Sequence, residues 1–272
     1  MSDTAIALTI AGSDSGGGAG VQADLKTFSA LGVYGASVIT ALTAQNTCEV
    51  RAILDVSPDF IKTQIDTVFD DLKIDAVKIG MLSRPAMIEC VAEALEARAF
   101  CQIVLDPVMV AKSGDHLLQP EAVAVLRDRL LPLACVVTPN LPEAGALLGK
   151  APAANEAEMM GAAEGILALG AKTVLLKGGH LEGAESLDIF HDGSEVMRLP
   201  AKRIATKNTH GTGCSLSSAI AAKLARGRSL SEAVADAKAY MTLAIAAADE
   251  LAVGRGHGPV HHFHALWPRL EA

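Results

Sequence analysis

The sequence predicts an α/β fold in which a mostly parallel central sheet is covered by helices on both faces, with one short antiparallel hairpin. Two observations predict it. Short apolar runs bounded by Gly, Asp or Pro alternate along the chain with longer amphipathic stretches, and this alternation is typical of a parallel sheet between two helical layers. Half of the 272 residues are hydrophobic, which is enough apolar surface to bury a large core.

The strands are expected at the short apolar runs, because a continuous apolar run bounded by turn residues indicates a buried strand. Two shorter runs flank Asp192-Gly193, a typical hairpin turn, and predict the antiparallel hairpin at residues 187–190 and 195–199. The predicted buried strands are residues 5–11, 76–80, 102–106, 135–137 and 172–176.

Helical spacing recurs between these strands. Residues 20–30 illustrate it, because Val21, Leu25 and Phe28 fall on one side of a helix. No internal repeat, charge block or Ser/Gly linker marks a second domain, so the sequence predicts one domain over residues 1–272. The other predicted helices lie near residues 58–72, 84–98, 120–131, 141–148, 156–169, 213–225 and 231–251.

Charge and cysteine content exclude several classes of protein. The formal net charge of −8 argues against a nucleic-acid or anionic-membrane partner, which would need a basic face. The five cysteines are odd in number and form no C-x-x-C pair, so neither a disulfide framework nor a zinc site is expected. No apolar run reaches the roughly 18 residues of a membrane span, and residues 1–4 lack a signal peptide's positive start. We expect a cytoplasmic enzyme or binding protein.

Two glycine-containing segments resemble nucleotide motifs and fail them. Residues 13–20 are rich in glycine and lie between the first strand and the first helix, but Val21 stands where a dinucleotide fingerprint needs its third glycine. Residues 144–150 approach a P-loop, but the spacing is one residue short and Ala151 replaces the Ser or Thr that coordinates Mg²⁺. We therefore expect the first segment to be a ligand-facing loop and discard the second.

The segment Asn-Thr-His-Gly-Thr-Gly-Cys-Ser at residues 208–215 leads directly into a helix of small residues. Free amide groups and the helix dipole at such a start favour an anion, and suit a phosphoryl group in transfer. Cys214 lies in the first turn, a position that lowers the pKa of a thiol. We expect Cys214 to be functional and the other cysteines, Cys48, Cys90, Cys101 and Cys135, to be inert core residues.

Other polar groups follow the predicted strands, where ligands bind in parallel sheets. Asp106 and Glu143 could hold Mg²⁺ beside phosphate oxygens, and Lys177 could reach a phosphate as a point charge. Four histidines cluster at residues 257–264, but no carboxylate or cysteine accompanies them. We interpret that cluster as a structural or solvent-facing tail rather than a metal site.

Taken together, these motifs resemble the hydroxymethylpyrimidine/phosphomethylpyrimidine kinases of thiamine biosynthesis, within the ribokinase-like superfamily. The resemblance spans nearly the whole chain in order. It implies a single ribokinase-like domain of three α/β/α layers, and an ATP- and Mg²⁺-dependent kinase that acts on 4-amino-5-hydroxymethyl-2-methylpyrimidine and then on its monophosphate. It also suggests a homodimer. The matching segments are residues 11–26, 40–47, 78–82, 106–109, 111–114, 138–140, 177–180 and 209–214.

The resemblance also implies roles for individual residues. Gln45 and Met81 would line the pyrimidine pocket, and the chemistry agrees, because an amide pairs with an aminopyrimidine edge and a thioether packs on its face. Cys214 would lie beside the substrate hydroxyl as a general base. The remaining expected residues are Gly12, Asp24 and Val108 for the substrate, Gly211, Thr212 and Gly213 around the transferred phosphate, Lys177, Asn140, Thr209 and Lys112 for ATP, and Asp106 and Glu143 for Mg²⁺.

Two other functions stay open on the sequence alone. Some pyridoxal or pyridoxine kinases of the same superfamily share the Gly-Thr-Gly-Cys loop, although Gln45 with Met81 favours the pyrimidine. Sugar kinases of the superfamily carry Asp at the position of Cys214, which argues against a sugar. The third possibility is a regulator that binds a pyrimidine without catalysis, which the intact Gly211, Gly213 and Cys214 disfavour.

Overall fold

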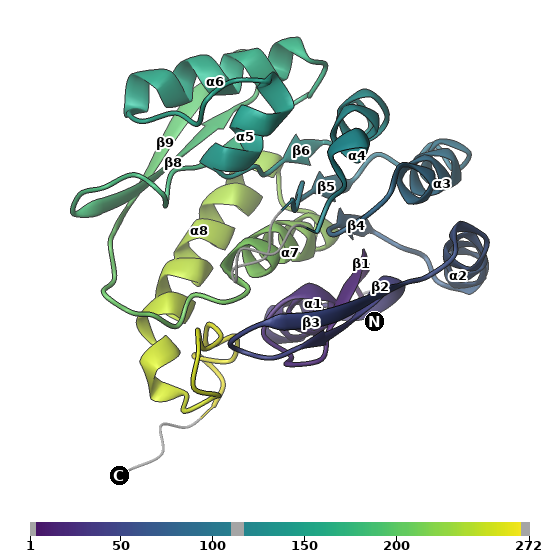
Figure 1. Cartoon of the computed structure of the whole chain (residues 1–272), viewed down its shortest axis with the longest axis horizontal. Helices are drawn as coiled ribbons and strands as arrows, with labels where there is room; N and C mark the ends of the chain where they lie inside the picture. The colour runs from purple at the N-terminus through teal and green to yellow at the C-terminus, as the bar shows by residue number, and fades with distance from the viewer. Residues whose placement is uncertain (1–3, 110–116, 268–272) are drawn as a thin grey trace.

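The computed structural model describes residues 4–109 and 117–267. Their strands form one nine-stranded sheet in the order β3-β2-β1-β4-β5-β6-β7-β8-β9, which Figure 1 shows running across the molecule between its helices. The strands are β1 (Ile6–Asp14), β2 (Tyr34–Gln45), β3 (Val50–Asp55), β4 (Ala76–Ile79), β5 (Ile103–Leu105), β6 (Val136–Val137), β7 (Val174–Lys177), β8 (Glu185–His191) and β9 (Val196–Lys202).

The centre of the sheet is parallel and its two margins are antiparallel. Strands β2, β1, β4, β5, β6 and β7 run in the same direction. Strand β3 pairs antiparallel with β2, and the β8–β9 hairpin continues antiparallel from β7. This arrangement confirms the predicted α/β class, the mostly parallel sheet and the hairpin. The carboxyl ends of the six parallel strands consequently meet at one edge, where a ligand site forms in such folds.

Strands β2 and β3 correct the expectation from sequence, which placed no strand between residues 30 and 57. Strand β2 contains Val38 and Ile39 among many Ala, Thr, Ser and Gly residues, so its apolar signal is weak. It is held by parallel pairing with β1 from Ile6↔Tyr34 onwards. Tertiary pairing therefore decides the conformation of a segment whose local preference is ambiguous.

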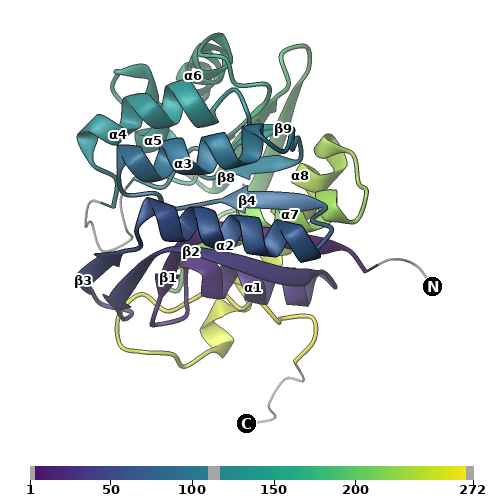
Figure 2. The ribbon, with the colours of Figure 1, turned by 90° about the vertical axis from the view of Figure 1, so that its right-hand side faces the viewer.

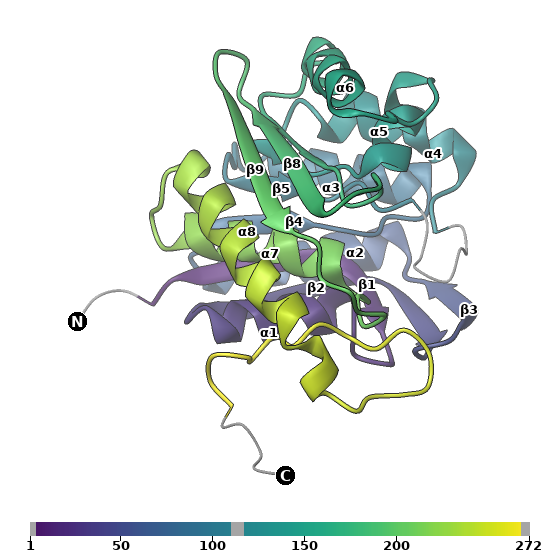
Figure 3. The same ribbon diagram turned by 90° about the vertical axis from the view of Figure 1, so that its left-hand side faces the viewer.

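Helices cover both faces of the sheet, as predicted. On one face, buried apolar residues of α1, α7 and α8 pack on the strands, and Figure 3 shows α8 beside α7. The other face packs on α2 to α6, where Figure 2 shows α2 and α3 side by side. The helices are α1 (Gly20–Ala30), α2 (Pro58–Asp71), α3 (Pro85–Glu96), α4 (Pro120–Val125), α5 (Leu141–Leu148), α6 (Glu156–Ala168), α7 (Thr212–Ala225) and α8 (Leu230–Ala246).

Two predicted helices differ in detail. The helix expected at residues 120–131 is α4 followed by a π-helical turn at Leu126–Leu130. The helix expected at 231–251 ends at Ala246 and is followed by a 3₁₀ turn at Ala248–Glu250. The segment that was rejected as a P-loop ends a helix rather than beginning one. Its Gly149 ends α5 in a left-handed conformation with φ of 63°.

The two edges of the sheet differ in character. Strand β3 lies at one edge, and its Ile53 and Leu54 side chains are exposed. Strand β9 lies at the other edge, and its exposed positions include Arg198, Pro200 and Lys202. Both edges carry exposed charged and apolar residues, with Arg51 on β3 and Val196 on β9 as examples, and of the two only β9 contains a proline.

The cysteines differ in part from expectation, whereas the histidine cluster agrees with its predicted structural role. Cys48 and Cys101 are exposed and are not core residues, while Cys90 and Cys135 are partly buried and pack against the core. His261 and His262 are buried, and the Nε2 atom of His262 lies 2.9 Å from the Ser215 hydroxyl. The histidine segment is therefore structural, and the described residues contain no group of three or more His, Cys, Asp or Glu residues arranged to hold a metal ion. None of the described helices is long and apolar enough to cross a membrane.

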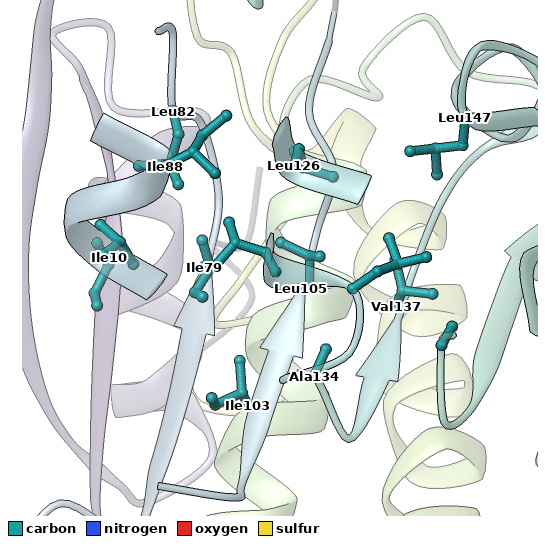
Figure 4. Close-up of a cluster of buried hydrophobic side chains, with 14 of the residues drawn as sticks. Ile10, Ile79, Leu82, Ile88, Ile103, Leu105, Leu126, Ala134, Val137 and Leu147 are labelled. Atoms are coloured by element: carbon teal, nitrogen blue, oxygen red, sulfur yellow. The ribbon is translucent and has the colours of Figure 1, made fainter. Parts of the chain in front are cut away.

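The larger hydrophobic core lies between the parallel strands and the helices on the α3 face of the sheet. Figure 4 shows Ile79, Leu105 and Val137, which project from three adjacent strands, with Ile88 of α3 above them. Each of these side chains is fully buried. Complete burial of a large aliphatic side chain contributes about 1.5–3 kcal/mol to folding, so this layer holds in place the strands whose ends carry the polar residues.

We expect Ile79→Ala to lower the free energy of unfolding by about 2–5 kcal/mol, because it deletes a fully buried side chain and leaves a cavity. Urea denaturation followed by circular dichroism measures the loss. Leu243→Ala is the control, because Leu243 is 58% exposed on α8 and an exposed position should change stability by no more than about 0.5 kcal/mol. Equal losses in both variants would contradict the assignment of the core.

Candidate active site

The glycine-rich loop after β1 is organised by the carboxylate of Asp14. This buried carboxylate accepts hydrogen bonds from the amides of Gly16, Gly18 and Ala19, at 2.8, 3.1 and 2.8 Å. The Nε2 atom of His210 lies 2.8 Å from the same carboxylate. Burial by itself would raise the pKa of Asp14, but the hydrogen bonds from His210 and the loop amides outweigh it and hold the pKa below its usual value.

This loop packs closely on the segment that begins α7. Gly211 has φ of 80°, and a Cβ atom there would overlap the carbonyl oxygen of Gly18. A Cβ atom on Gly18 would in turn overlap the His210 ring. Both positions therefore require glycine, Gly211 because of its backbone conformation as well. The close approach brings the end of β1 and the start of α7 together.

The start of α7 presents unpaired donors. The Thr212 hydroxyl donates to the Thr209 carbonyl at 2.7 Å, so both threonines belong to the turn that enters the helix. The amides of Gly213 and Cys214, in the first turn, have no acceptor among the described residues. This geometry can receive an anion at the end of the helix dipole.

Cys214 differs from the sequence-based expectation in its ionisation. Burial raises the pKa of its thiol to about 11, the charge of Lys78 opposes the rise, and the carboxylates of Asp24 and Asp106 add to it. The expectation that the helix start lowers this pKa is therefore wrong for the protein without ligands. Desolvation outweighs the first-turn position, because the helix dipole is a small effect beside the cost of burying a thiolate.

Several residues expected around the substrate lie near the ends of β1, β2 and β4. Met81 is buried directly after β4, and its sulfur would lie 3.0 Å from a Cβ atom on Gly12. The Gln45 amide at the end of β2 lies 3.1 Å from the Thr43 hydroxyl and 3.4 Å from His210 Nε2. Val108 is half-buried just beyond β5. The structure thus joins Gly12 to Met81 and joins Gln45 to the Asp14–His210 pair.

Asp24 lies below this region rather than at its surface. Its side chain is fully buried, and its carboxylate accepts hydrogen bonds from Thr9, Ser218 and Lys78. The expected direct contact with the substrate is not supported by this placement, because all of these partners lie within the protein. Asp24 instead supports the elements that carry the site.

A second polar group gathers at the ends of β5, β6 and β7. Lys177 Nζ lies 3.0 Å from Asp106 and 3.9 Å from Glu143, and 3.3 Å from the position of a Cβ atom on Gly213. Asn140 caps α5, exchanging hydrogen bonds with Glu143 at 2.7 and 2.9 Å. Burial alone would lower the pKa of Lys177, but Asp106 and Glu143 raise it above its ordinary value. The lysine is therefore a cation beside the α7 start.

The carboxylates of Asp106 and Glu143 fit the chemistry expected of a Mg²⁺ site. Both are buried and both face Lys177. Burial, with the nearby Asp106, raises the pKa of Glu143 to about 7, although Lys177 opposes the rise. A bound divalent cation would favour the ionised form of this carboxyl group. Two hard oxygen donors also suffice for Mg²⁺, which keeps several waters and phosphate oxygens in its shell.

The remaining residues were either not placed or not predicted. Lys112 and the loop expected to cover the site, residues 111–116, lie outside the described residues. Lys78 and His210 were given no role from the sequence. His210 contacts Asp14 in the loop after β1, and Lys78 pairs with Asp24 beneath that region. A lysine in the middle of an apolar strand was the available signal for Lys78, because an unpaired buried lysine is costly. The position of His210 directly before the helix start was the signal for that residue.

We expect Glu143→Gln to stabilise the metal-free protein more at pH 8 than at pH 5. The folded pKa lies above the unfolded value of about 4.5, so the folded state binds more protons and wild-type stability falls as pH rises from 4.5 through 7. Glutamine keeps an oxygen for the cap and cannot ionise. Thermal unfolding of wild type and variant at both pH values measures the difference.

The matched control is Glu158→Gln, because Glu158 occupies the corresponding cap position of α6 and is exposed. Its effect should be the same at both pH values. A pH-independent effect of Glu143→Gln would contradict the raised pKa.

Comparison with known proteins identifies the family. A family model described as phosphomethylpyrimidine kinase matches residues 14–261. A hydroxymethylpyrimidine/phosphomethylpyrimidine kinase of Rhizobium meliloti is 62% identical over 264 residues, covering 97% of this chain and 99% of the relative. A thiamine biosynthesis bifunctional protein of Geobacter sulfurreducens is 54% identical over 258 residues, covering 95% of this chain and 52% of that protein.

A solved structure confirms the fold. The ADP complex of Bacillus subtilis pyridoxal kinase superposes with a TM-score of 0.90 at 38% identity, covering 97% of this chain and 99% of that one. The family match includes both the loop after β1 and the start of α7. The chain belongs to the phosphomethylpyrimidine kinase family.

Proposed function

We infer that the chain transfers the terminal phosphoryl group of ATP to 4-amino-5-hydroxymethyl-2-methylpyrimidine and then to the resulting monophosphate, in thiamine biosynthesis. Family membership makes it a kinase. The observation that carries the proposal is the position of the α7 start. It lies between the expected pyrimidine residues at the ends of β1, β2 and β4 and the Lys177–Asp106–Glu143 group at the ends of β5 to β7.

The α7 start is suited to the phosphoryl group in transit. Free amides of Gly213 and Cys214 point out of the helix, and they would donate to oxygens that gain charge during transfer. Lys177 lies next to Gly213 and adds a full positive charge. Because phosphoryl transfer needs little covalent help from the protein, such positioning and charge neutralisation account for most of the catalysis.

ATP is proposed to enter from the side of Lys177, Asn140 and Thr209. Asn140 pairs with Lys177 at the end of β7, and the Thr209 carbonyl accepts the Thr212 hydroxyl at the start of α7. Asp106 and Glu143 would hold Mg²⁺ there. Bound Mg²⁺ would supply neutralising charge to the phosphates, and Lys177 already shares that task from the protein.

On the acceptor side, Gln45 and Met81 are proposed to recognise the pyrimidine. The Gln45 amide contacts Thr43 and His210, and its remaining donor and acceptor capacity would suit an aminopyrimidine edge. Met81 fills the space beside Gly12 and offers a thioether to the ring. The position of Val108 beyond β5 supports its proposed apolar contact with the same ring.

The two phosphorylation steps place different demands on Cys214. In the first step, the alcohol must lose a proton, and Cys214 is the proposed acceptor. In the second step, the acceptor is a phosphate monoester that is already largely ionised near pH 7, so no strong base is needed. Since the thiol pKa is raised to about 11, only a small fraction is thiolate at neutral pH in the protein without ligands.

We expect the rate of the first step to rise with pH between 7 and 10, because the thiolate fraction grows about tenfold per pH unit below the thiol pKa. The second step should lack this rise. Cys214→Ala should remove the rise and slow the first step by about 10²-fold or more, with a smaller loss in the second. Quenched-flow measurement of each step checks both, with the partly buried Cys90→Ala as control. Equal losses in the two steps would oppose a base role.

We expect the pyrimidine alcohol, with ATP and Mg²⁺, to yield a monophosphate and then a diphosphate, identified by mass spectrometry. Pyridoxal is the competing substrate to assay in parallel, because a pyridoxal kinase has the same fold. A higher kcat/KM with pyridoxal would reassign the substrate. Pyrimidine binding without turnover would instead favour a regulator.

A further inference from the structure

A fully buried ion pair lies below the reactive end of α7. Lys78 of β4 and Asp24 of α1 are both fully buried, and Lys78 Nζ lies 3.0 and 2.9 Å from the two carboxylate oxygens. The carboxylate also accepts the hydroxyl of Thr9 at 2.6 Å and that of Ser218 at 2.7 Å. One carboxylate therefore ties together α1, β1, β4 and α7.

The Lys78 side chain extends toward the edge of the sheet that carries the site. Lys78 and Gly80 lie on the same side of the chain, because alternate residues of a strand share a face. A Cβ atom on Gly80 would lie 2.7 Å from Lys78 Nζ. The ammonium group therefore lies beside Gly80, the residue that precedes Met81. Glycine at position 80 leaves the space that the ammonium occupies.

A side-chain hydrogen bond joins α1 to α7 beside this ammonium. The Asp24 carboxylate accepts the Ser218 hydroxyl at 2.7 Å. Cys214 and Ser218 are four residues apart on α7, so they lie on one face of that helix. The Asp24–Ser218 contact therefore fixes the same face of α7 that carries Cys214.

We propose that Lys78 is a positioning residue for Cys214: held by Asp24, it places a fixed positive charge beneath the thiol, while Asp24 anchors the face of α7 that carries it. The proposal deepens the proposed function, because it concerns the base of the first phosphorylation step. Lys78 is fully buried against Asp24 and would act on the reaction only through Cys214.

The charges around the thiol explain why a lysine is useful there. Asp24 of α1 and Asp106, directly after β5, both oppose formation of a thiolate, whereas Lys78 of β4 favours it. Lys177 of β7 also interacts with the partly buried thiol. Lys78 is bonded directly to Asp24, so its charge offsets that of one of the two opposing carboxylates.

The test measures alkylation of Cys214 by iodoacetamide as a function of pH, resolved by peptide mass spectrometry, without substrates. Lys78→Met should shift the profile to higher pH by about one unit or more, and Asp24→Asn should shift it to lower pH. Opposite shifts are the signature of charge, because loosening of the structure would expose the thiol in both variants and move both profiles in the same direction. Shifts of the same sign would overturn the proposal.

The double variant Lys78→Met/Asp24→Asn separates charge from stability. Removing one partner of a buried pair is strongly destabilising, whereas neutralising both is tolerated better, so the double variant should melt closer to wild type than Lys78→Met does. Because the two charges act on the thiol with opposite sign, the double variant should return the alkylation profile toward that of wild type. Lys78→Met alone should lower kcat for the first step about tenfold, with KM changed less than about threefold, and the double variant should lose less. A double variant whose profile stays shifted as far as that of Lys78→Met would contradict the opposing action of the two charges.

Lys223→Met is the matched control, because Lys223 pairs with Asp236 at 3.0 Å farther along the same helix. It should leave both the alkylation profile and kcat unchanged. Since alkylation needs neither ATP nor pyrimidine, failure of this proposal is distinguishable from failure of the proposed function. If the profiles shift as expected but the pyrimidine is not phosphorylated, only the substrate assignment falls.

Discussion

The parallel pairing of β1 with β4 is the constraint on which the geometry of the site depends. In this register Thr9 lies opposite Lys78 and Ile10 opposite Ile79, so the strand ends that carry Gly12 and Met81 finish side by side. The same register brings Thr9 and Lys78 to one carboxylate, that of Asp24. Helix α7 then contacts the same carboxylate, because the Ser218 hydroxyl donates a hydrogen bond to it. Apolar packing above and below the strands supplies stability, and this register determines which loops meet.

Local charge, rather than net charge, governs what the protein can bind. The chain carries a formal charge of −8, yet its proposed ligands are phosphates. Lys177 and the free amides of α7 place a positive charge and hydrogen-bond donors together at one point of this acidic molecule. The carboxylates of Asp106 and Glu143 lie beside Lys177 and offset its charge. The proposed binding of a phosphate there would therefore also require the divalent cation that these carboxylates are proposed to hold.

The sequence predicted those features that local chemistry determines. Strand–helix alternation was enough for the α/β class, and the glycine segments at residues 13–20 and 208–215 were enough to locate the loops of the site. Strand β2 was missed because its small residues have no clear periodicity, and only pairing with β1 defines it. The burial of individual residues could not be predicted from the sequence either. Asp24 follows a functional motif in the sequence but is fully buried beneath the site. The pKa of Cys214 was mispredicted for the same reason, since burial is a property of the folded chain.

The unequal edges of the sheet bear on how copies of this protein can associate. Edge strands offer unpaired backbone groups to any neighbouring strand, and charged residues and proline discourage such pairing. Strand β9 carries Arg198, Pro200 and Lys202, while β3 exposes Ile53 and Leu54. Pairing through β9 is therefore opposed by the missing backbone donor of Pro200, whereas β3 contains no proline and carries the exposed charge of Arg51 instead. The two ends of the sheet thus resist extension by different chemical means.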